Sequence, residues 1–271
     1  MSRVVALGTA DAFSSGARGN TAWLVEDGGA LCAVDFGPTA MLAMRRAGRD
    51  PQELRAIHFT HLHGDHIGGW PFLLVDAVFR ARRTQRLTVS GPPGTRDRLR
   101  SLWAACYADA AGKELPFELE VRELAPGDLA ELCGRRVQAL RAQHQRPPHV
   151  ALSLRLHGPA GVLAFTGDTG PHQGLGELAD GAALLCSECT ELRTPPDSTG
   201  GSTDYPAEAG RRHLSWDDLR AVLPALRVRK IALGHLGPEA RTAAASIEAE
   251  ARALGLDLRV CDDLDAIELS T

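Results

Sequence analysis

Three histidines and one aspartate stand close together in the segment 61–66, which reads HLHGDH. The segment follows an apolar stretch, so we expect it to form a loop at the end of a strand. Neutral imidazoles and carboxylates need partners when they are buried, and they are ligands of zinc and neighbouring transition metals. His61 and His63 can point to one side, whereas a turn between them and the next pair sends Asp65 and His66 to a second position. One loop can therefore serve two metal ions.

Three further residues of ligand type lie far along the chain. These residues are His144, Asp168 and His235, and each comes just past an expected strand, at 137–141, 162–166 and 230–233 respectively. Strands that end at one edge of a sheet bring such residues together. The three distant residues, added to the segment 61–66, complete two metal-binding sets.

Short β-rich runs with turn signals alternate with helical segments along the chain. We expect strands at 4–7, 21–26, 30–35, 54–59, 87–90, 137–141, 152–156, 162–166, 183–187 and 230–233. We expect helices at 39–47, 67–78, 95–110, 215–223 and 239–254. Strands in both halves with helices between them indicate two packed sheets covered by helices. The chain shows no linker or short-period repeat, so we expect one domain over residues 1–271.

The composition is that of an ordinary globular protein. Of 271 residues, 44% are hydrophobic and 24% are charged, and the net charge is −4. This balance gives no global positive field that would attract nucleic acid. The N-terminal apolar run is too short for a signal peptide, and no run approaches the roughly 20 apolar residues of a membrane span. Six cysteines in a chain of this length do not indicate a disulfide scaffold. We therefore expect a soluble cytoplasmic protein.

The motifs of ligand type occur in the order that characterises a known superfamily. The segment 61–66, His144, Gly167-Asp168-Thr169 and Gly234-His235 resemble the successive motifs of the metallo-β-lactamase fold superfamily. The branch is similar to the ribonuclease Z-like group through Gly8-Thr9, Arg18-Gly19-Asn20, Val34-Asp35-Phe36-Gly37, Gly91-Pro92, Glu188 and His213-Leu214-Ser215. The resemblance implies an α/β (α+β) fold, an αββα four-layer sandwich of two packed mixed sheets with the metals at one edge.

The resemblance also implies which residues hold the metals. The two sets would be His61, His63 and His144, and Asp65, His66 and His235, with Asp168 bridging them. Asp35 matches an early aspartate of the family that braces the metal loop, and such groups orient ligating histidines. We expect two Zn²⁺ ions for this nitrogen-rich set, with Mn²⁺ or iron as alternatives. Two such ions can share a hydroxide and stabilise the attacking and leaving oxygens.

Asp65, His213 and Glu188 are the expected catalytic residues. In ribonuclease Z-like enzymes the histidine that matches His213 lies near the scissile phosphate, with a glutamate that Glu188 would match. An imidazolium there can bind a phosphoryl oxygen or protonate the leaving oxygen. The alternative interpretation is structural, because His213 lies near Ser215, a good helix cap with Asp218 at the third helical position. Both interpretations can hold together. His172 lies close to the bridging aspartate and is given no role.

The sequence departs from a ribonuclease Z that processes tRNA. Such an enzyme usually carries a long protruding arm between the third metal histidine and the bridging aspartate, but His144 and Asp168 are only 24 positions apart (168 − 144). The family's basic-aromatic sequence after the last histidine is absent, and the basic run 80–86 is counterbalanced by the acidic segment 114–131. Phosphate contacts dominate affinity for nucleic acid. We therefore do not expect tRNA as a partner.

The function expected is that of a metal-dependent hydrolase, a phosphodiesterase acting on a small phosphodiester or nucleotide-type substrate. Hydrolysis of a sulfate ester, a lactone or a β-lactam is the alternative on the same frame. A tRNA 3′-end endonuclease and a non-catalytic metal-binding protein are less favoured. We expect a small-molecule substrate and no membrane partner, and a homodimer is left open. The segment 190–211 is rich in Gly, Pro, Ser and Thr and is a candidate lid.

Overall fold

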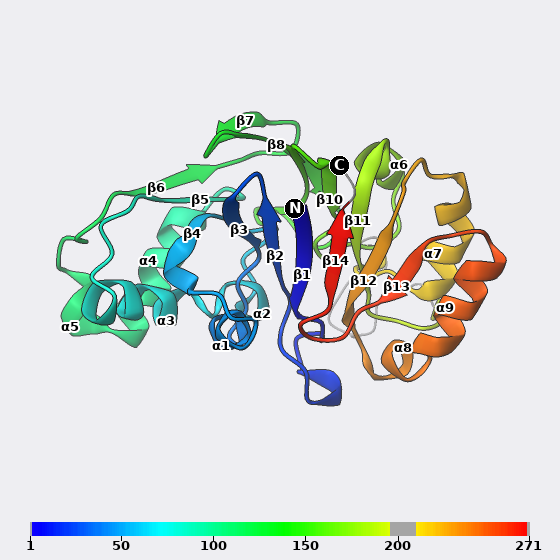
Figure 1. Cartoon of the computed structure of the whole chain (residues 1–271), viewed down its shortest axis with the longest axis horizontal. Helices are drawn as coiled ribbons and strands as arrows, with labels where there is room; N and C mark the ends of the chain where they lie inside the picture. The colour runs from blue at the N-terminus through cyan, green and yellow to red at the C-terminus, as the bar shows by residue number, and fades with distance from the viewer. Residues whose placement is uncertain (1, 196–209, 270–271) are drawn as a thin grey trace.

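The computed structural model describes residues 2–195 and 210–269, so most of the candidate lid at 190–211 lies outside the described residues. Within the described residues, two seven-stranded sheets form the centre of the molecule (Figure 1). The first sheet has the order β14-β1-β2-β3-β4-β5-β6 and consists of β1 (Ser2–Gly8), β2 (Ala22–Asp27), β3 (Ala30–Val34), β4 (Leu54–His58), β5 (Leu87–Gly91), β6 (Leu119–Glu123) and β14 (Ala266–Leu269). The second has the order β13-β12-β11-β10-β9-β8-β7 and consists of β7 (Leu129–Leu132), β8 (Arg135–Ala142), β9 (Ala151–Gly158), β10 (Gly161–Phe165), β11 (Ala182–Cys189), β12 (Ile231–Leu236) and β13 (Leu258–Val260).

Both sheets mix parallel and antiparallel pairs. In the first sheet the pairs from β14 to β3 are antiparallel and those from β3 to β6 are parallel. In the second, β7 to β10 pair antiparallel and β10 to β13 pair parallel. The expected mixed sheets are therefore confirmed.

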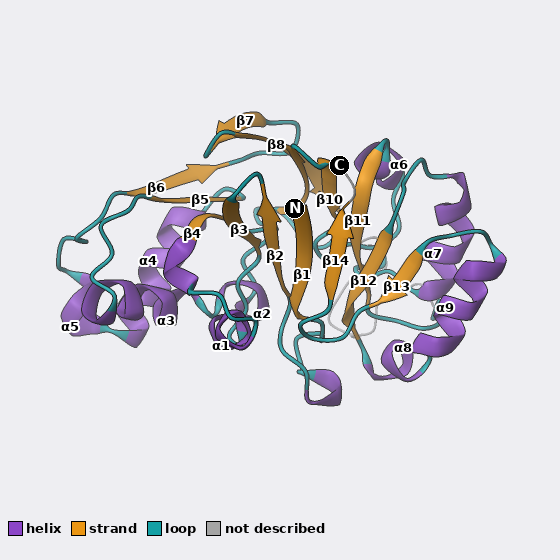
Figure 2. Ribbon diagram, viewed as in Figure 1, coloured by secondary structure: helices purple, strands orange, loops and turns teal. Residues whose placement is uncertain are grey.

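Helices cover the outer face of each sheet, as Figure 2 shows. The helices of the first half are α1 (Ala40–Arg46), α2 (Gly64–Ile67), α3 (Trp70–Val75), α4 (Thr95–Cys106) and α5 (Ala108–Ala111). Those of the second half are α6 (Leu175–Ala179), α7 (Trp216–Val222), α8 (Pro238–Thr242) and α9 (Ala244–Ala253). No helix in residues 2–195 and 210–269 is long and apolar enough to cross a membrane.

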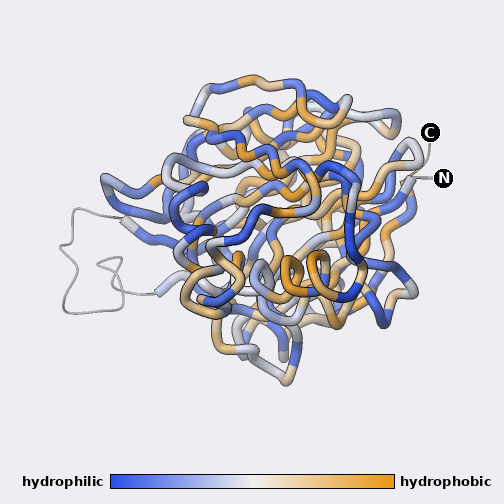
Figure 3. Tube along the Cα trace, turned by 90° about the vertical axis from the view of Figure 1, so that its left-hand side faces the viewer, coloured by the Kyte–Doolittle hydropathy of each residue, from blue (hydrophilic) through white to orange (hydrophobic). Residues whose placement is uncertain are grey.

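Three hydrophobic clusters hold these layers together. One lies between the two sheets and includes Trp23 and Phe165. Another joins the first sheet to its helices and includes Trp70, and the third joins the second sheet to its helices through Trp216. The hydrophobic segments, orange in Figure 3, lie mainly in the interior of the trace. Burial of apolar surface between sheets and between each sheet and its helices gives the four layers of an αββα sandwich, as the sequence predicted.

The helix expected at 67–78 begins earlier and is interrupted. The helix α2 already starts at Gly64, so Asp65 and His66 lie in its first turn rather than in a free loop. The chain then breaks before α3, where a Cβ atom at Gly69 would lie 2.5 Å from the carbonyl oxygen of Gly37. Only glycine permits this close approach of two backbones. The contact holds the junction of α2 and α3 against the loop that follows β3.

Other elements also differ from the expected bounds. The helices expected at 95–110 and 239–254 are each divided in two, at Tyr107 and Ala243. The strand expected at 230–233 continues to Leu236, so His235 lies within β12 rather than after it. The backbone of His235 has φ 49°, which turns its side chain out of the regular strand pattern. The strands β6, β7, β13 and β14 and the helix α6 were not expected from the sequence.

Stability should decrease with falling pH because of His58, the last residue of β4. His58 is 1% exposed, and its Nδ1 atom lies 2.8 Å from the hydroxyl of Ser90. Burial lowers the pKa of His58 to about 3, whereas an unfolded histidine has a pKa of about 6.5. As the pH falls below 6.5 the unfolded chain takes up a proton that the folded chain does not, so the folded state loses relative stability. This one residue should cost about 2 kcal/mol between pH 7 and pH 5.

The measurement is urea unfolding of the natural protein and of His58→Asn at both pH values. All other titrating groups are shared, so the difference between the two pH dependences isolates His58. The variant should lose about 2 kcal/mol less than the natural protein. Equal losses in the two proteins would show that His58 is protonated in the folded state.

Candidate metal centre

The seven residues of ligand type come from both sheets and meet in one place. His61 and His63 lie between β4 and α2, and Asp65 and His66 lie in the first turn of α2. His144 follows β8, Asp168 follows β10, and His235 lies in β12. The hydrogen bond from the Leu152 backbone N–H to the Thr60 carbonyl, 2.8 Å long, ties the strand end of the first sheet to the second. The structure thus brings all seven predicted residues together.

The first cluster consists of three histidines. The Nδ1 atom of His63 lies 3.0 Å from Nε2 of His61 and 3.1 Å from Nε2 of His144. Three nitrogen atoms that converge in this way form the donor set of a three-histidine metal site. Burial lowers the pKa of His144 to about 4, and burial also lowers the pKa of His61. Both rings are therefore neutral, which is the form of imidazole that binds a metal.

The second cluster combines two carboxylates and two histidines. The Nε2 atom of His66 lies 3.3 Å from Oδ2 of both Asp65 and Asp168, and Nε2 of His235 lies 3.2 Å from Oδ2 of Asp168 and 3.6 Å from Oδ2 of Asp65. The two Nε2 atoms are buried, and neither has a hydrogen-bond partner in the described part of the chain. Buried polar atoms without partners are costly. A metal ion at this point would satisfy both, so the residues fit a metal.

One oxygen atom lies between the two clusters. Oδ2 of Asp168, besides its contacts in the second cluster, lies 3.7 Å from Nε2 of His61 and 3.7 Å from Nε2 of His144. Burial raises the pKa of Asp168, but the neighbouring imidazoles, His235 first, outweigh it and hold this pKa well below the usual range. The carboxylate is therefore ionised. A single carboxylate oxygen thus faces the nitrogen atoms of both clusters.

Asp35 accepts hydrogen bonds from Thr60 and His66 and so fixes the segment 61–66. One carboxylate oxygen, Oδ1, accepts a hydrogen bond from the Thr60 backbone N–H at 2.8 Å. The other, Oδ2, accepts hydrogen bonds from the Thr60 hydroxyl and from Nδ1 of His66, each 2.8 Å long. With Nδ1 donating to Asp35, the lone pair of the Nε2 atom of His66 is left facing the second cluster. Contacts of this kind fix the tautomer and orientation of a ligating ring.

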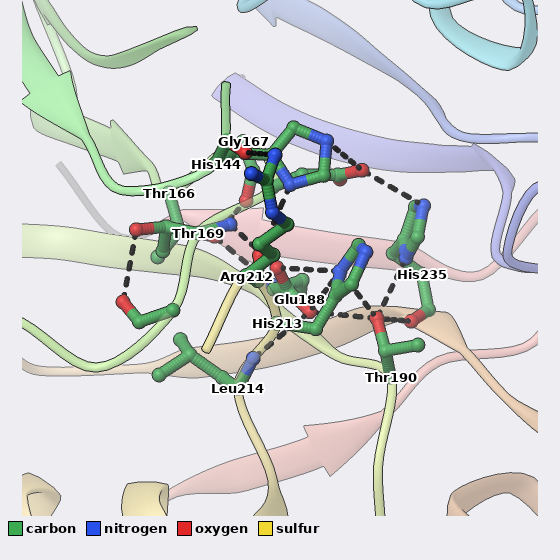
Figure 4. Close-up of polar contacts among 12 residues, drawn as sticks. His144, Thr166, Gly167, Thr169, Glu188, Thr190, Arg212, His213, Leu214 and His235 are labelled. Carbon is green, nitrogen blue, oxygen red and sulfur yellow. Dashed lines mark hydrogen bonds and ion pairs between the residues drawn. The ribbon is translucent and has the colours of Figure 1, made fainter. Parts of the chain in front are cut away.

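His213 lies beside both clusters and is held by Glu188, as Figure 4 shows. Nδ1 of His213 lies 3.1 Å from each carboxylate oxygen of Glu188, and its ring centroid is 4.9 Å from that of His144 and 5.4 Å from that of His235. Burial lowers the pKa of His213, but the carboxylate of Glu188 raises it more strongly, to about 9. The ring is therefore an imidazolium at neutral pH, and Nε2 is the atom left for another partner.

The carboxylate of Glu188 is itself fixed on both oxygens. Glu188 is 3% exposed. Oε1 accepts a hydrogen bond from the Thr169 backbone N–H, and Oε2 accepts one from the Thr190 hydroxyl, each 2.6 Å long. Glu188 is thus placed to position His213 rather than to reach a substrate.

The structural interpretation of the neighbourhood of His213 also holds. Ser215 caps α7, with its hydroxyl accepting from the Asp218 backbone N–H at 3.1 Å and the Asp218 carboxylate accepting from the Ser215 backbone N–H at 2.8 Å. This confirms the predicted capping box. The cap fixes the chain two residues after His213, so it helps to place the ring.

Some residues of the site gave no signal in the sequence. The Thr190 hydroxyl lies 2.8 Å from Nδ1 of His235, and the carbonyl oxygen of Arg212 lies 3.0 Å from Nδ1 of His144. Each of these atoms contacts Nδ1, the ring nitrogen that points away from the cluster, as Asp35 does in His66. Threonines and carbonyls occur throughout any chain, so only the fold reveals this role. His172, in contrast, accepts a hydrogen bond from the Gly174 backbone N–H at 3.1 Å and belongs to neither cluster.

Comparisons with known proteins agree with this geometry. The family described as Anti-Pycsar protein Apyc1 matches residues 2–196. The ribonuclease Z of Methanothermobacter thermautotrophicus is 28% identical over 315 residues, which cover 99% of this chain and 97% of that protein. Human tRNase Z, short form, superimposes with a TM-score of 0.75 at 20% identity, covering 99% of this chain and 100% of that one. The metallo-β-lactamase fold protein YhfI from Bacillus subtilis gives a TM-score of 0.75 at 15% identity, covering 98% of each chain.

The fold, the clustered histidines and aspartates, and these matches lead to the same assignment. The chain belongs to the family described as Anti-Pycsar protein Apyc1, within the ribonuclease Z-like group of the metallo-β-lactamase superfamily, and it is a metal-dependent hydrolase.

Proposed function

We propose that the chain is a binuclear zinc phosphodiesterase that acts on a small phosphodiester of nucleotide type. The observation that carries this proposal is the position of Oδ2 of Asp168, which lies between a cluster of three histidines and a cluster of aspartates and histidines. In this proposal the ligands are His61, His63 and His144 for one ion, and Asp65, His66 and His235 for the other, with Asp168 bridging. The nitrogen-rich donor set favours zinc.

Two metal ions held by these residues would activate a water molecule and neutralise charge on the attacking and leaving oxygens. The chain itself supplies His213, whose positive charge beside the clusters can bind a phosphoryl oxygen or give a proton to the leaving oxygen. Glu188 holds that ring in place and keeps it charged. Burial raises the pKa of Asp65, but contacts with His235 and His66 lower it below its usual range. Asp65 is therefore ionised and can accept a hydrogen bond from the attacking water.

The chain between the third histidine and the bridging aspartate supports a small substrate. Most of the span from His144 to Asp168 is taken up by the hairpin of β9 and β10 inside the second sheet, where β9 also pairs with β8 and β10 also pairs with β11. The span therefore belongs to the fold and provides no protruding arm for a large RNA.

The basic run 80–86 also supports this view, because three of its four arginines contact other groups of the chain. Arg80 pairs with Asp76, and Arg86 pairs with Glu120 at 2.6 Å. Arg83 is buried and donates to main-chain carbonyl oxygens. Phosphate contacts are the main source of affinity for RNA. An arginine that is already paired within the protein contributes less binding free energy to such a contact.

A substrate panel tests the proposed reaction. Zinc-loaded protein should hydrolyse bis(p-nitrophenyl) phosphate faster than p-nitrophenyl sulfate, a lactone or nitrocefin, because the charged His213 and the paired metal clusters suit an anionic diester. Asp168→Asn, prepared in parallel, should show only background and serves as the control for contaminating hydrolases. A faster rate on the sulfate, lactone or β-lactam would transfer the protein to the alternative class. A higher kcat/KM on precursor tRNA than on nucleotide diesters would favour the activity that its ribonuclease Z relatives are named for.

A further inference from the structure

A cavity lies among the helices that cover the first sheet. Residues of α3, α4, α5 and the edge strand β6, which lie together on the left of Figure 1, line it, and its volume is about 360 Å³. The described residues that line it include no member of either metal cluster. Pockets that enclose small organic ligands have volumes of roughly 300–1,000 Å³. This cavity therefore has the size of a site for one small molecule.

The walls of this cavity are apolar. They include the rings of Trp70 and Trp103 and the aliphatic side chains of Leu99, Leu119 and Val121. Leu99 and Trp103 are four residues apart in α4 and so share one face of that helix. Leu119 and Val121 share one face of β6 and are only partly buried. A hydrocarbon body in the cavity would therefore remove further apolar surface from water.

The indole N–H of Trp70 is a buried donor without a partner. Trp70 is 1% exposed, and its Nε1 atom forms no hydrogen bond within residues 2–195 and 210–269. The indole of Trp216, which is equally buried, donates to Oε2 of Glu250 at 2.8 Å. A buried donor that is left unpaired costs free energy. Because Trp70 lines the cavity, a ligand that carries a hydrogen-bond acceptor would satisfy it.

The charged side chains that line the cavity are all basic. They are Arg96, Arg100 and Lys113, and the described part of the lining contains no acidic residue. Arg96 donates to the Val121 carbonyl oxygen at 2.7 Å. Arg100 and Lys113 are exposed, and their side chains form no hydrogen bond or ion pair with the described residues. Two free positive charges at an apolar cavity favour an anionic ligand.

The hydrogen-bonding groups of these side chains further restrict the ligand. Indole, guanidinium and ammonium groups donate hydrogen bonds and accept none. A nucleobase presents donors as well as acceptors at its edges, so its donors would find no side-chain acceptor in this lining. An ionised carboxylate only accepts, and its two oxygens can take hydrogen bonds from several donors at once. The lining therefore suits a carboxylate joined to a hydrocarbon body.

We propose that this cavity binds a small amphiphilic carboxylate of the fatty-acid class. Its carboxylate accepts hydrogen bonds from Trp70, Arg100 and Lys113, and its hydrocarbon body lies against the apolar walls. The site shares no residue with the metal clusters, so this inference does not depend on the proposed function.

Calorimetric titration of the zinc-loaded protein with octanoate, acetate, 1-octanol and octylammonium tests the inference. Acetate has the carboxylate without the hydrocarbon body, 1-octanol has the body without the charge, and octylammonium has the opposite charge. Octanoate should bind most tightly of the four. In the series from acetate to octanoate, each added methylene should tighten binding by up to about fourfold, the advantage of one buried methylene. The affinity for 1-octanol should be weaker by about 10-fold or more, because it lacks hydrogen bonds to a charged group.

NMR signals of the indole N–H groups locate the bound octanoate. The chain has four tryptophans, and the signal of Trp70 is assigned by its absence from the spectrum of Trp70→Phe. In the natural protein octanoate should shift this signal downfield, because the N–H gains an acceptor. The signal of Trp216, whose indole already donates to Glu250, should stay in place.

Reversal of the charge at the cavity provides a test that does not alter a buried residue. Arg100→Glu combined with Lys113→Glu should lose octanoate binding and should bind octylammonium instead. A general loss of stability would not produce this exchange of preference. The control Arg252→Glu makes the same change at an exposed arginine of α9, and it should keep the preference for octanoate.

A second control separates the cavity from coordination of the carboxylate by zinc. Asp168→Asn alters the candidate metal centre and should keep the natural affinity for octanoate. Loss of octanoate binding in this variant, with binding retained in the Arg100 and Lys113 double variant, would place the carboxylate at the metal clusters and overturn the inference. Equal affinities for octanoate and acetate, or an unchanged Trp70 signal at saturating octanoate, would also overturn it.

Discussion

Replacing Asp168 with alanine should remove both metal ions, because one oxygen of this side chain serves both clusters. Oδ2 of Asp168 lies 3.2 to 3.7 Å from the Nε2 atoms of His61, His66, His144 and His235. Elemental analysis of purified natural protein should give close to two transition-metal ions per chain, and Asp168→Ala should give well below one. Turnover of bis(p-nitrophenyl) phosphate should fall to background in the same variant.

Asp180→Ala is the matched control, since Asp180 is a surface aspartate that pairs with Arg227. It should keep two ions and its activity. Loss of only one ion in Asp168→Ala would place Asp168 in a single cluster. Full occupancy in that variant would reject the bridging assignment altogether.

His213→Ala should keep the metals and lose turnover by about 10²–10⁴-fold, which is the usual contribution of general acid–base assistance. His213 is charged because Glu188 raises its pKa, and it lies beside both clusters. If the ring protonates the leaving oxygen, the deficit should be smaller for p-nitrophenolate, a good anionic leaving group, than for an alkyl alcohol. Steady-state rates on a p-nitrophenyl diester and an alkyl diester give both deficits.

The outcomes of this experiment separate three roles of His213. Loss of metal together with activity would make His213 a ligand, a role that its position near His144 and Asp168 permits geometrically. An equal deficit on both diesters would favour binding of a phosphoryl oxygen over proton transfer. His172→Ala is the control, because His172 belongs to neither cluster, and it should keep both metals and turnover.

The candidate ligands could be found from the sequence because their signal is local. Four residues of ligand type in the segment 61–66 are conspicuous in any chain, and the rule that strand ends converge at one edge located His144, Asp168 and His235. The environment of these residues depends on contacts that no local pattern shows. The position of His66 in a helix follows from the close packing of backbones at Gly69, and the hydroxyl of Thr190 reaches His235 across 45 positions of sequence.

The strands that the sequence did not predict are those with the weakest hydrophobic signal. Three of the five residues of β6 are charged, and none of the five is fully buried. The strand β7 is four residues long with one buried residue, and β13 has only three residues. Each of them lies at the edge of its sheet, where a strand needs little apolar surface. Their pairing with the neighbouring strands, rather than their own composition, makes them strands.

Anomalous X-ray diffraction from crystals of the zinc-loaded protein tests the central claim most directly. Two zinc peaks about 3.5–4 Å apart are expected, one among His61, His63 and His144 and the other among Asp65, His66 and His235, with Oδ2 of Asp168 between them. A single peak, or two peaks that do not share Asp168, would contradict the binuclear centre on which the proposed phosphodiesterase rests.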